Sequence, residues 1–106
     1  MRMIHIVRNE KYIVAQGHAG KKDEPKTEEV IQACAAVTAI TQTLLFSVLR
    51  VESEYDYEPF YQLEKGIFIL DTEFVSERSL LLADAFMLGA EALSGAYPNH
   101  ISVEKQ

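Results

Sequence analysis

The chain has 106 residues, of which 48% are hydrophobic and 25% charged, a composition typical of one globular domain rather than a disordered segment. The net charge is −6, and no cluster of Lys and Arg forms a footprint for nucleic acid. The acidic surface would suit a basic protein or peptide partner, or serve solubility alone. One cysteine excludes an internal disulfide and fits a reducing compartment, and the N-terminus lacks the apolar core of a signal peptide. We therefore expect a single soluble, cytoplasmic domain over residues 1–106.

Two strands are predicted at the start of the chain. Residues 2–8, RMIHIVR, are rich in Ile and Val. Asn9 and Glu10 predict a tight hairpin turn, because Asn tolerates positive φ, and residues 11–19 predict the second strand. Strict alternation along this strand places Tyr12, Val14, Gln16 and His18 on one face, and Ile13, Ala15, Gly17 and Ala19 on the other.

A polar loop and a long helix follow. Residues 20–27, GKKDEPKT, have the composition of a loop. Apolar residues at helical spacing predict a helix over about 28–51, with Thr27 as N-cap, unless Pro25 opens the helix earlier. Six polar residues interrupt the stretch 34–51, which we interpret as too polar for a membrane span.

The second half of the chain predicts a hairpin, a helix and a final strand. Residues 55–63 and 67–71 form the hairpin, and Pro59 marks its first strand as an edge strand. A helix over 77–96 is capped by Ser76 or Ser79 and ends near Gly95 and Pro98. Residues 100–104 form a short strand. The order ββαββαβ predicts an α+β fold, a mixed or antiparallel sheet with both helices on one face.

His18 and Cys34 are the candidate catalytic residues. His18 lies between glycines at the end of a predicted strand, in QGHAG, and Cys34 lies in the second turn of the predicted helix. A thiolate can attack a peptide carbonyl when a nearby imidazole handles its proton. The alternatives are a buried structural cysteine and an ordinary hydrogen-bonded or exposed histidine. The histidines and the cysteine lack zinc-site spacing, and cofactor-binding motifs are absent, so we expect no metal and no cofactor.

Three segments carry a resemblance to a known family. GHAG at 17–20, CAAVTAITQTL at 34–44 and LLADAFMLGAEALSGAYPNHISV at 81–103 resemble the ribosomal-processing cysteine proteases (Prp, formerly the YsxB-like family). The resemblance implies a homodimeric cysteine endopeptidase that removes a short N-terminal extension from a large-subunit ribosomal protein. It implies that His18 and Cys34 are the catalytic pair. Related phage proteins act on what looks to be a virion protein.

The chain departs from the family's pattern just before Cys34, where EEVIQA replaces a G-x-D-x-V motif, and it carries Thr38 where Ser is common. Asp23, Glu28 and Glu29 are candidates to orient His18. Backbone N–H groups at the start of the first helix are expected to bind the oxyanion, and residues 20–27 to close over an extended basic peptide. The alternatives are a non-catalytic binding module and a structural or assembly protein of the same fold.

Overall fold

In the computed structural model, which describes residues 2–21 and 23–106, one sheet contains all five strands: β1 (Arg2–Arg8), β2 (Tyr12–Gly20), β3 (Tyr61–Glu64), β4 (Ile67–Asp71) and β5 (Ile101–Lys105). Their order is β3-β4-β2-β1-β5. The pair β1–β5 is parallel and the other pairs are antiparallel, so the sheet is mixed.

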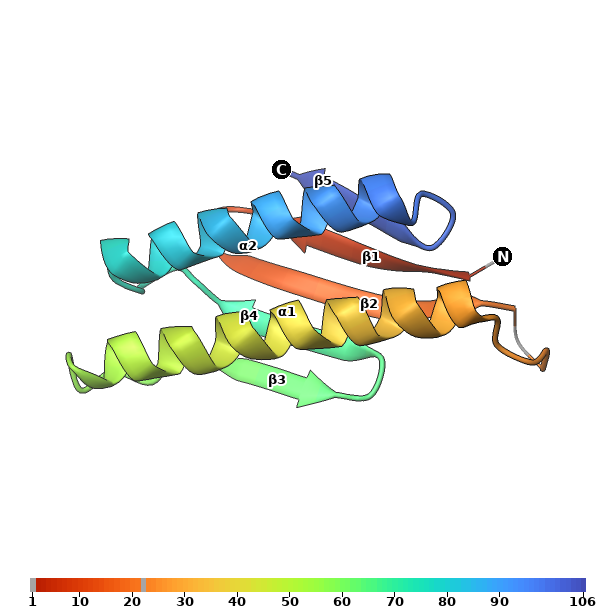
Figure 1. Cartoon of the computed structure of the whole chain (residues 1–106). Helices are drawn as coiled ribbons and strands as arrows, with labels where there is room; N and C mark the ends of the chain where they lie inside the picture. Colours follow the sequence, from red (N-terminus) through yellow and green to blue (C-terminus); the bar gives the residue numbers. More distant parts are fainter. Residues whose placement is uncertain (1, 22) are drawn as a thin grey trace.

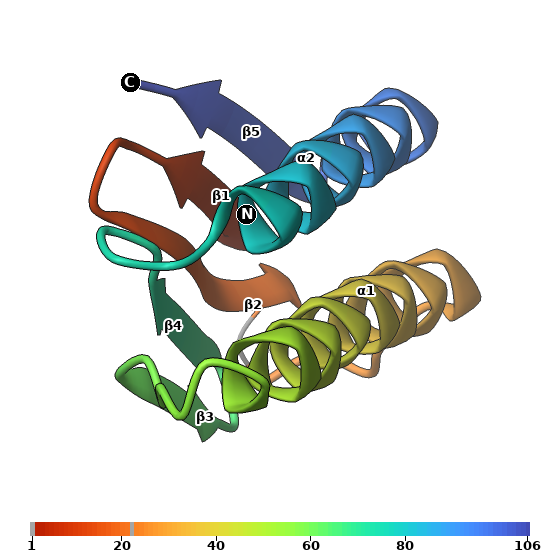
Figure 2. The ribbon, with the colours of Figure 1, turned by 90° about the vertical axis from the view of Figure 1, so that its left-hand side faces the viewer.

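Helices α1 (Glu28–Ser53) and α2 (Glu77–Ala96) run antiparallel to each other across one face of this sheet (Figures 1 and 2). The core lies between the two layers. It is formed by apolar side chains from four strands and both helices, including Ile6, Ile13, Leu45, Leu70, Met87 and Ile101. The element order and the one-sided helical layer confirm the predicted α+β fold.

Side-chain caps define where both helices begin. The N–H of Val30 donates to Thr27 Oγ1 at 3.2 Å, so Thr27 rather than Pro25 sets the start of α1. Ser76 caps α2 in the same way, by accepting from the N–H of Ser79. Asn9 also acts through its side chain, because Oδ1 accepts from the N–H groups of Lys11 and Tyr12. Asn9 forms the predicted turn by this contact and not by the positive φ that the sequence suggested.

The strand predicted over residues 55–63 is wrong for its first six residues. Helix α1 continues to Ser53, and the N–H groups of Tyr55 and Tyr57 then donate to the carbonyl of Glu52, which winds the chain into a turn. Asp56 occupies a left-handed conformation at φ 54° in this turn. Only Tyr61–Glu64 pairs with β4, and it forms an edge of the sheet, as Pro59 had indicated.

Both helices contain a stretch of 18 residues that is long and apolar enough, by composition alone, to cross a membrane, with a mean hydropathy of 1.6 in α1 and 1.3 in α2. The interpretation that residues 34–51 are too polar for a span is therefore wrong as a compositional argument. The scattered hydroxyl groups lower the hydropathy only modestly because α1 carries no charge between Val30 and Leu49. One face of each helix is nevertheless buried against the sheet, as in core helices of globular domains.

Candidate active site

A β-bulge places His18. Ile4 of β1 pairs with Gly17, but Arg2 pairs with Gly20, so β2 contains one more residue than β1 over this interval. Gly17 has φ +111°, a conformation that favours glycine. Strict alternation would put His18 on the face of the sheet away from the helices. His18 instead lines a cavity beneath α1, because a bulge redirects the side chains around it. The prediction that His18 shares a face of the sheet with Tyr12, Val14 and Gln16 is therefore wrong.

Cys34 lines the same cavity from the helical layer. It lies in the second turn of α1, partly buried against the core, with Thr38 and Gln42 following it along one stripe of the helix. The cavity has a volume of about 450 Å³ and is open to solvent on one side. The structure thus brings the two sequence-predicted residues, from a strand and from a helix, to one cavity.

The hairpin of β3 and β4 forms the third wall of this cavity. Leu63, Glu64, Lys65, Gly66 and Ile67 line it, and Lys26 reaches it from the loop before α1. Sequence reasoning identified this hairpin but assigned it no part in the site. In the sequence, only the glycine after Glu64-Lys65 pointed to this turn. The turn lies beside His18 because β2 pairs with β4, and this long-range pairing could not be read from the sequence. The mainly apolar walls can hold an extended peptide segment.

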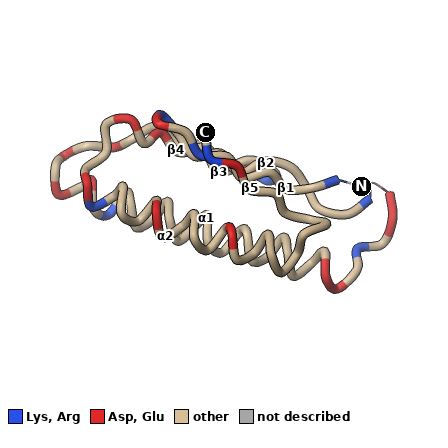
Figure 3. Tube along the Cα trace, turned by 90° about the horizontal axis from the view of Figure 1, so that it is seen from above, with Lys and Arg blue, Asp and Glu red and all other residues tan. Residues whose placement is uncertain are grey.

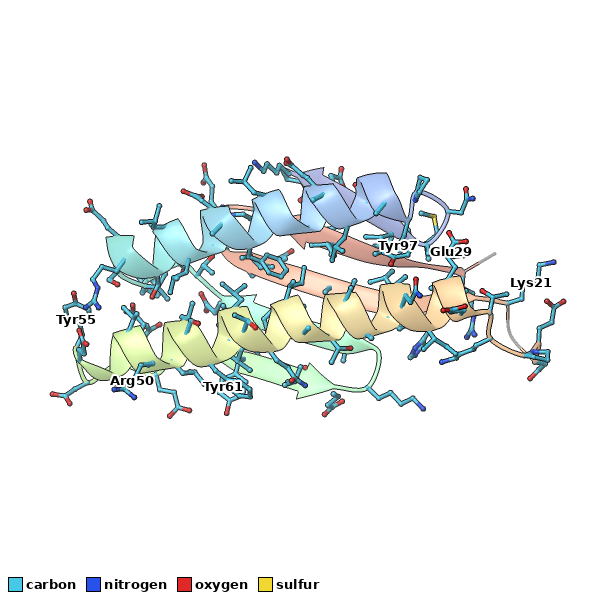
Figure 4. The ribbon with its side chains drawn as sticks, viewed as in Figure 1. Lys21, Glu29, Arg50, Tyr55, Tyr61 and Tyr97 are labelled. Carbon is cyan, nitrogen blue, oxygen red and sulfur yellow. The ribbon has the colours of Figure 1, made fainter. Side chains whose placement is uncertain are left out.

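The candidate orienting carboxylates lie elsewhere. Glu28 accepts from Gln32 Nε2 at 3.2 Å, and Glu29 lies 3.5 Å from Nε2 of His100. Figure 4 shows Glu29 at the start of α1, at the end of the molecule where α2 also ends. Asp23 is exposed in a turn at φ 65°. Within the described ranges, 2–21 and 23–106, no side-chain hydrogen bond reaches His18 from any of the three.

The first turn of α1 is a poor source of oxyanion donors. Val30 N–H already donates to Thr27 Oγ1. Glu28 begins the helix six residues before Cys34, which is roughly 9 Å along the axis at the usual rise. The hydroxyl of Thr38 donates to the carbonyl of Cys34 at 2.9 Å, within the helix. Over the described part of the chain, no group of three or more His, Cys, Asp or Glu side chains is arranged to hold a metal ion.

Solved structures share this fold over its whole length. The SMU.848 protein of Streptococcus mutans is 22% identical, with a TM-score of 0.73, and the match covers 100% of this chain and 94% of that one. The essential ribosomal processing protease Prp of S. aureus, in complex with a covalently linked product peptide, is 15% identical with a TM-score of 0.62. Prp in complex with a substrate peptide is 14% identical with a TM-score of 0.59. Both Prp matches cover 100% of each chain.

No family model matches the sequence, and a search of curated proteins found no match. The similarity therefore concerns the arrangement of the backbone, which extends from the first strand to the last. The chain has the fold of the ribosomal processing protease Prp.

Proposed function

We propose that this protein is a cysteine endopeptidase with Cys34 as nucleophile and His18 as general acid and base. The observation that carries the proposal is the convergence of these two side chains, 16 positions apart in the sequence, on one peptide-sized cavity. The fold adds support, because Prp has been solved with a product peptide covalently linked to it.

The proposed reaction proceeds in two steps. His18 takes the thiol proton, and the sulfur of Cys34 forms a bond to the scissile carbonyl carbon. The carbon–nitrogen bond then breaks as His18 donates that proton to the leaving amine. In the second step water attacks the thioester carbonyl carbon and His18 takes a proton from it. The carbon–sulfur bond then breaks, His18 returns that proton to the sulfur of Cys34, and the N-terminal fragment leaves as a carboxylic acid. Backbone donors near the bulge or the β3–β4 turn would bind the oxyanion, because the first turn of α1 is distant.

The proposed substrate is the N-terminal extension of a large-subunit ribosomal protein, processed in the cytoplasm. The support is the name and the bound peptides of the S. aureus Prp structures, together with the acidic net charge, which suits a basic peptide. Strand β3 offers one free edge beside the cavity, where an extended peptide could add as a further strand. A phage virion protein is the alternative substrate for the same chemistry.

The test is incubation of the purified protein with the host's precursor ribosomal protein. We expect the wild type to remove the N-terminal extension, and Cys34→Ala and His18→Ala to lose at least about 10³-fold in kcat. Mass spectrometry of the product gives the cleaved bond. Gln42→Ala is the matched control for a change on the same stripe of α1, and it keeps both reacting groups. Equal cleavage by wild type and Cys34→Ala would contradict the proposal.

A non-catalytic binding module is the second candidate. Two observations favour it: Cys34 packs partly against the core, and the segment before it departs from the family's motif. Iodoacetamide separates the two functions, because an activated thiolate alkylates fast near neutral pH and a buried structural thiol does not. A thiol in the wild type that reacts no faster than in His18→Ala would favour the binding module.

We also propose that the protein is a homodimer whose contact is the outer face of the helical layer, here called the helical outer face: Ala35, Ala39, Thr43 and Phe46 of α1, and Leu81, Ala85, Leu88 and Ala92 of α2. Phe46, Leu81 and Leu88 are 59, 69 and 66% exposed. α1 carries no charged residue from Val30 to Leu49, in a chain that is 25% charged, and in Figure 3 charges gather mainly in the loops and at the ends of the elements.

Two of the three acidic residues of α2, Asp84 and Glu91, do not interrupt this face, and the third, Glu77, lies at its end in the first turn of the helix. Asp84 forms an ion pair with Arg8 at 2.6 Å, and Glu91 lies 3.5 Å from Lys105, so both point toward the β1–β5 side of the sheet. An apolar groove of about 250 Å³ runs between the helices beside Gly89, whose missing side chain leaves it open. A second copy could fill this groove with its own exposed Leu88 across a twofold axis.

A further inference from the structure

The turn between β3 and β4 is built against the imidazole of His18. Gly66 lies in this turn at φ +83°. A Cβ atom added at Gly66 would lie 2.5 Å from Nε2 of His18 and 2.8 Å from Cε1, closer than side chains pack. The ring therefore occupies the space that any other residue at position 66 would need for its side chain.

The turn is also fixed to the strand that carries His18. Gly17 N–H donates to the carbonyl of Gly66 at 2.9 Å, and the pairing of β2 with β4 begins at Gln16 and Ile67. The backbone of Gly66 thus cannot retreat without breaking contacts with the residue before His18. The imidazole is the end of a rotatable side chain, and in the described ranges 2–21 and 23–106 it makes no side-chain hydrogen bond that would hold it. If a side chain at position 66 overlaps the imidazole of His18, we therefore expect the imidazole to move rather than the backbone of residue 66.

We propose that Gly66 is a positioning residue for His18, and that the β3–β4 turn sets where the imidazole lies in the cavity. Gly66 supplies a flat backbone wall, held by its carbonyl, against which the Nε2 edge of the ring rests. The sequence suggested that a carboxylate orients His18. In this proposal a glycine of the β3–β4 hairpin, distant in the sequence, positions the ring instead. The inference deepens the proposed function, since a placed imidazole matters most if His18 transfers protons.

Gly66→Ala tests the inference, with Gly20→Ala as the matched control. Gly20 also has positive φ, at +89°, but its added Cβ would meet only the methyl groups of Val30, at 3.2 Å or more. Both variants should therefore lose similar stability in urea unfolding. Only Gly66→Ala should move the ring signals of His18 in a ¹H–¹⁵N spectrum, assigned by their loss in His18→Ala. It should also lower kcat for precursor cleavage by about 100-fold while KM changes little.

The outcomes separate this inference from the proposed function. His18 ring signals in Gly66→Ala that match those of the wild type would overturn the inference. If the wild type cleaves no precursor, the proposed function fails, and the spectra still decide the role of Gly66. If Gly66→Ala does not fold, the double variant with His18→Ala decides: recovered folding supports the steric contact, and continued failure overturns it.

Discussion

Glu52 is a buried carboxylate that joins the two helices. It is 2% exposed, at the end of α1, and its oxygens accept from the N–H and hydroxyl of Ser76 and from the hydroxyl of Ser79 at 2.5 Å. These donors are the N-cap residue of α2, Ser76, and a residue of its first turn, Ser79. A carboxylate at a helix N-terminus is favoured both by the exposed N–H groups and by the helix dipole. One residue thus fixes the end of one helix to the start of the next.

The same contacts determine how Glu52 titrates. Burial alone raises the pKa of this carboxyl, but the hydrogen bonds from Ser76 and Ser79 and the nearby charge of Arg78 outweigh it, and the pKa lies below its ordinary value of 4.5. A carboxyl whose pKa is lower in the folded than in the unfolded chain stabilises the fold above the unfolded value. We therefore expect this contribution to be lost as the pH falls through about 4.5 toward the folded value.

The variant Glu52→Gln should lower the free energy of unfolding by about 2 kcal/mol at neutral pH, since charge-assisted hydrogen bonds are lost from a buried site. The difference from the wild type should shrink on acidification. Urea unfolding across this pH range measures both effects. Glu54→Gln is the control, because Glu54 is half exposed and pairs with Arg78 at the surface, and it should cost less. A Glu52→Gln deficit that is independent of pH would contradict this account.

At the scale of the secondary-structure elements, the bulge in β2 determines where His18 lies in the candidate site. At Gly17 an added Cβ would overlap the carbonyl oxygen of Met3, a backbone atom of the paired strand that cannot move away alone. The φ of +111° adds strain for any other residue.

We expect Gly17→Ala to lower the free energy of unfolding by at least about 3 kcal/mol, because strain and overlap act together. Urea unfolding gives the value. The loss should exceed that of Gly20→Ala, whose added Cβ meets only the side chain of Val30, at 3.2 Å or more, and no backbone atom. Equal losses for Gly17→Ala and Gly20→Ala would show that the close approach of Gly17 to β1 adds nothing to the loss of stability.

The elements themselves were largely predictable from the sequence. Thr27 and Ser76 are side-chain caps at the start of helical periodicity, so both helices begin where they were predicted to begin. Residues 55–60 were not predictable, because their alternation of aromatic and acidic residues resembles a strand, while the local contact of Tyr55 and Tyr57 with the helix end dominates. His18 and Cys34 could be named from their chemistry. Their pairing was implied by the family resemblance alone, because strict alternation misplaces His18. The wall at Gly66 was not predictable, because it depends on long-range pairing.

At the scale of the whole molecule, the sheet has helices on one face, and the outer surface of those helices is apolar. Figure 2 shows both helices on one side of the sheet, so a dimer formed there would place the four helices between two sheets. Sedimentation should then give twice the monomer mass of 12.0 kDa.

Leu88→Glu should convert this dimer to a monomer, because it places two like charges across a twofold contact. Phe74→Glu is the matched control: Phe74 is 71% exposed but lies outside both helices, between β4 and α2, and this variant should keep the mass of the wild type. A wild type that sediments as a monomer would contradict the proposed dimer. If this monomer also binds lipid vesicles, the helical outer face binds a membrane surface instead.

Helix α1 meets a different environment on almost every side. One stripe is in the core, the next carries Cys34, Thr38 and Gln42 into the cavity, and the side away from the sheet belongs to the helical outer face. A systematic substitution scan should therefore find no tolerant stripe along residues 30–49, in contrast to the three-to-four-residue rhythm of tolerated positions that a helix with one solvated side produces. Adaptation of this protein to a new substrate would then be confined mostly to the loop before α1 and to the hairpin residues other than Gly66.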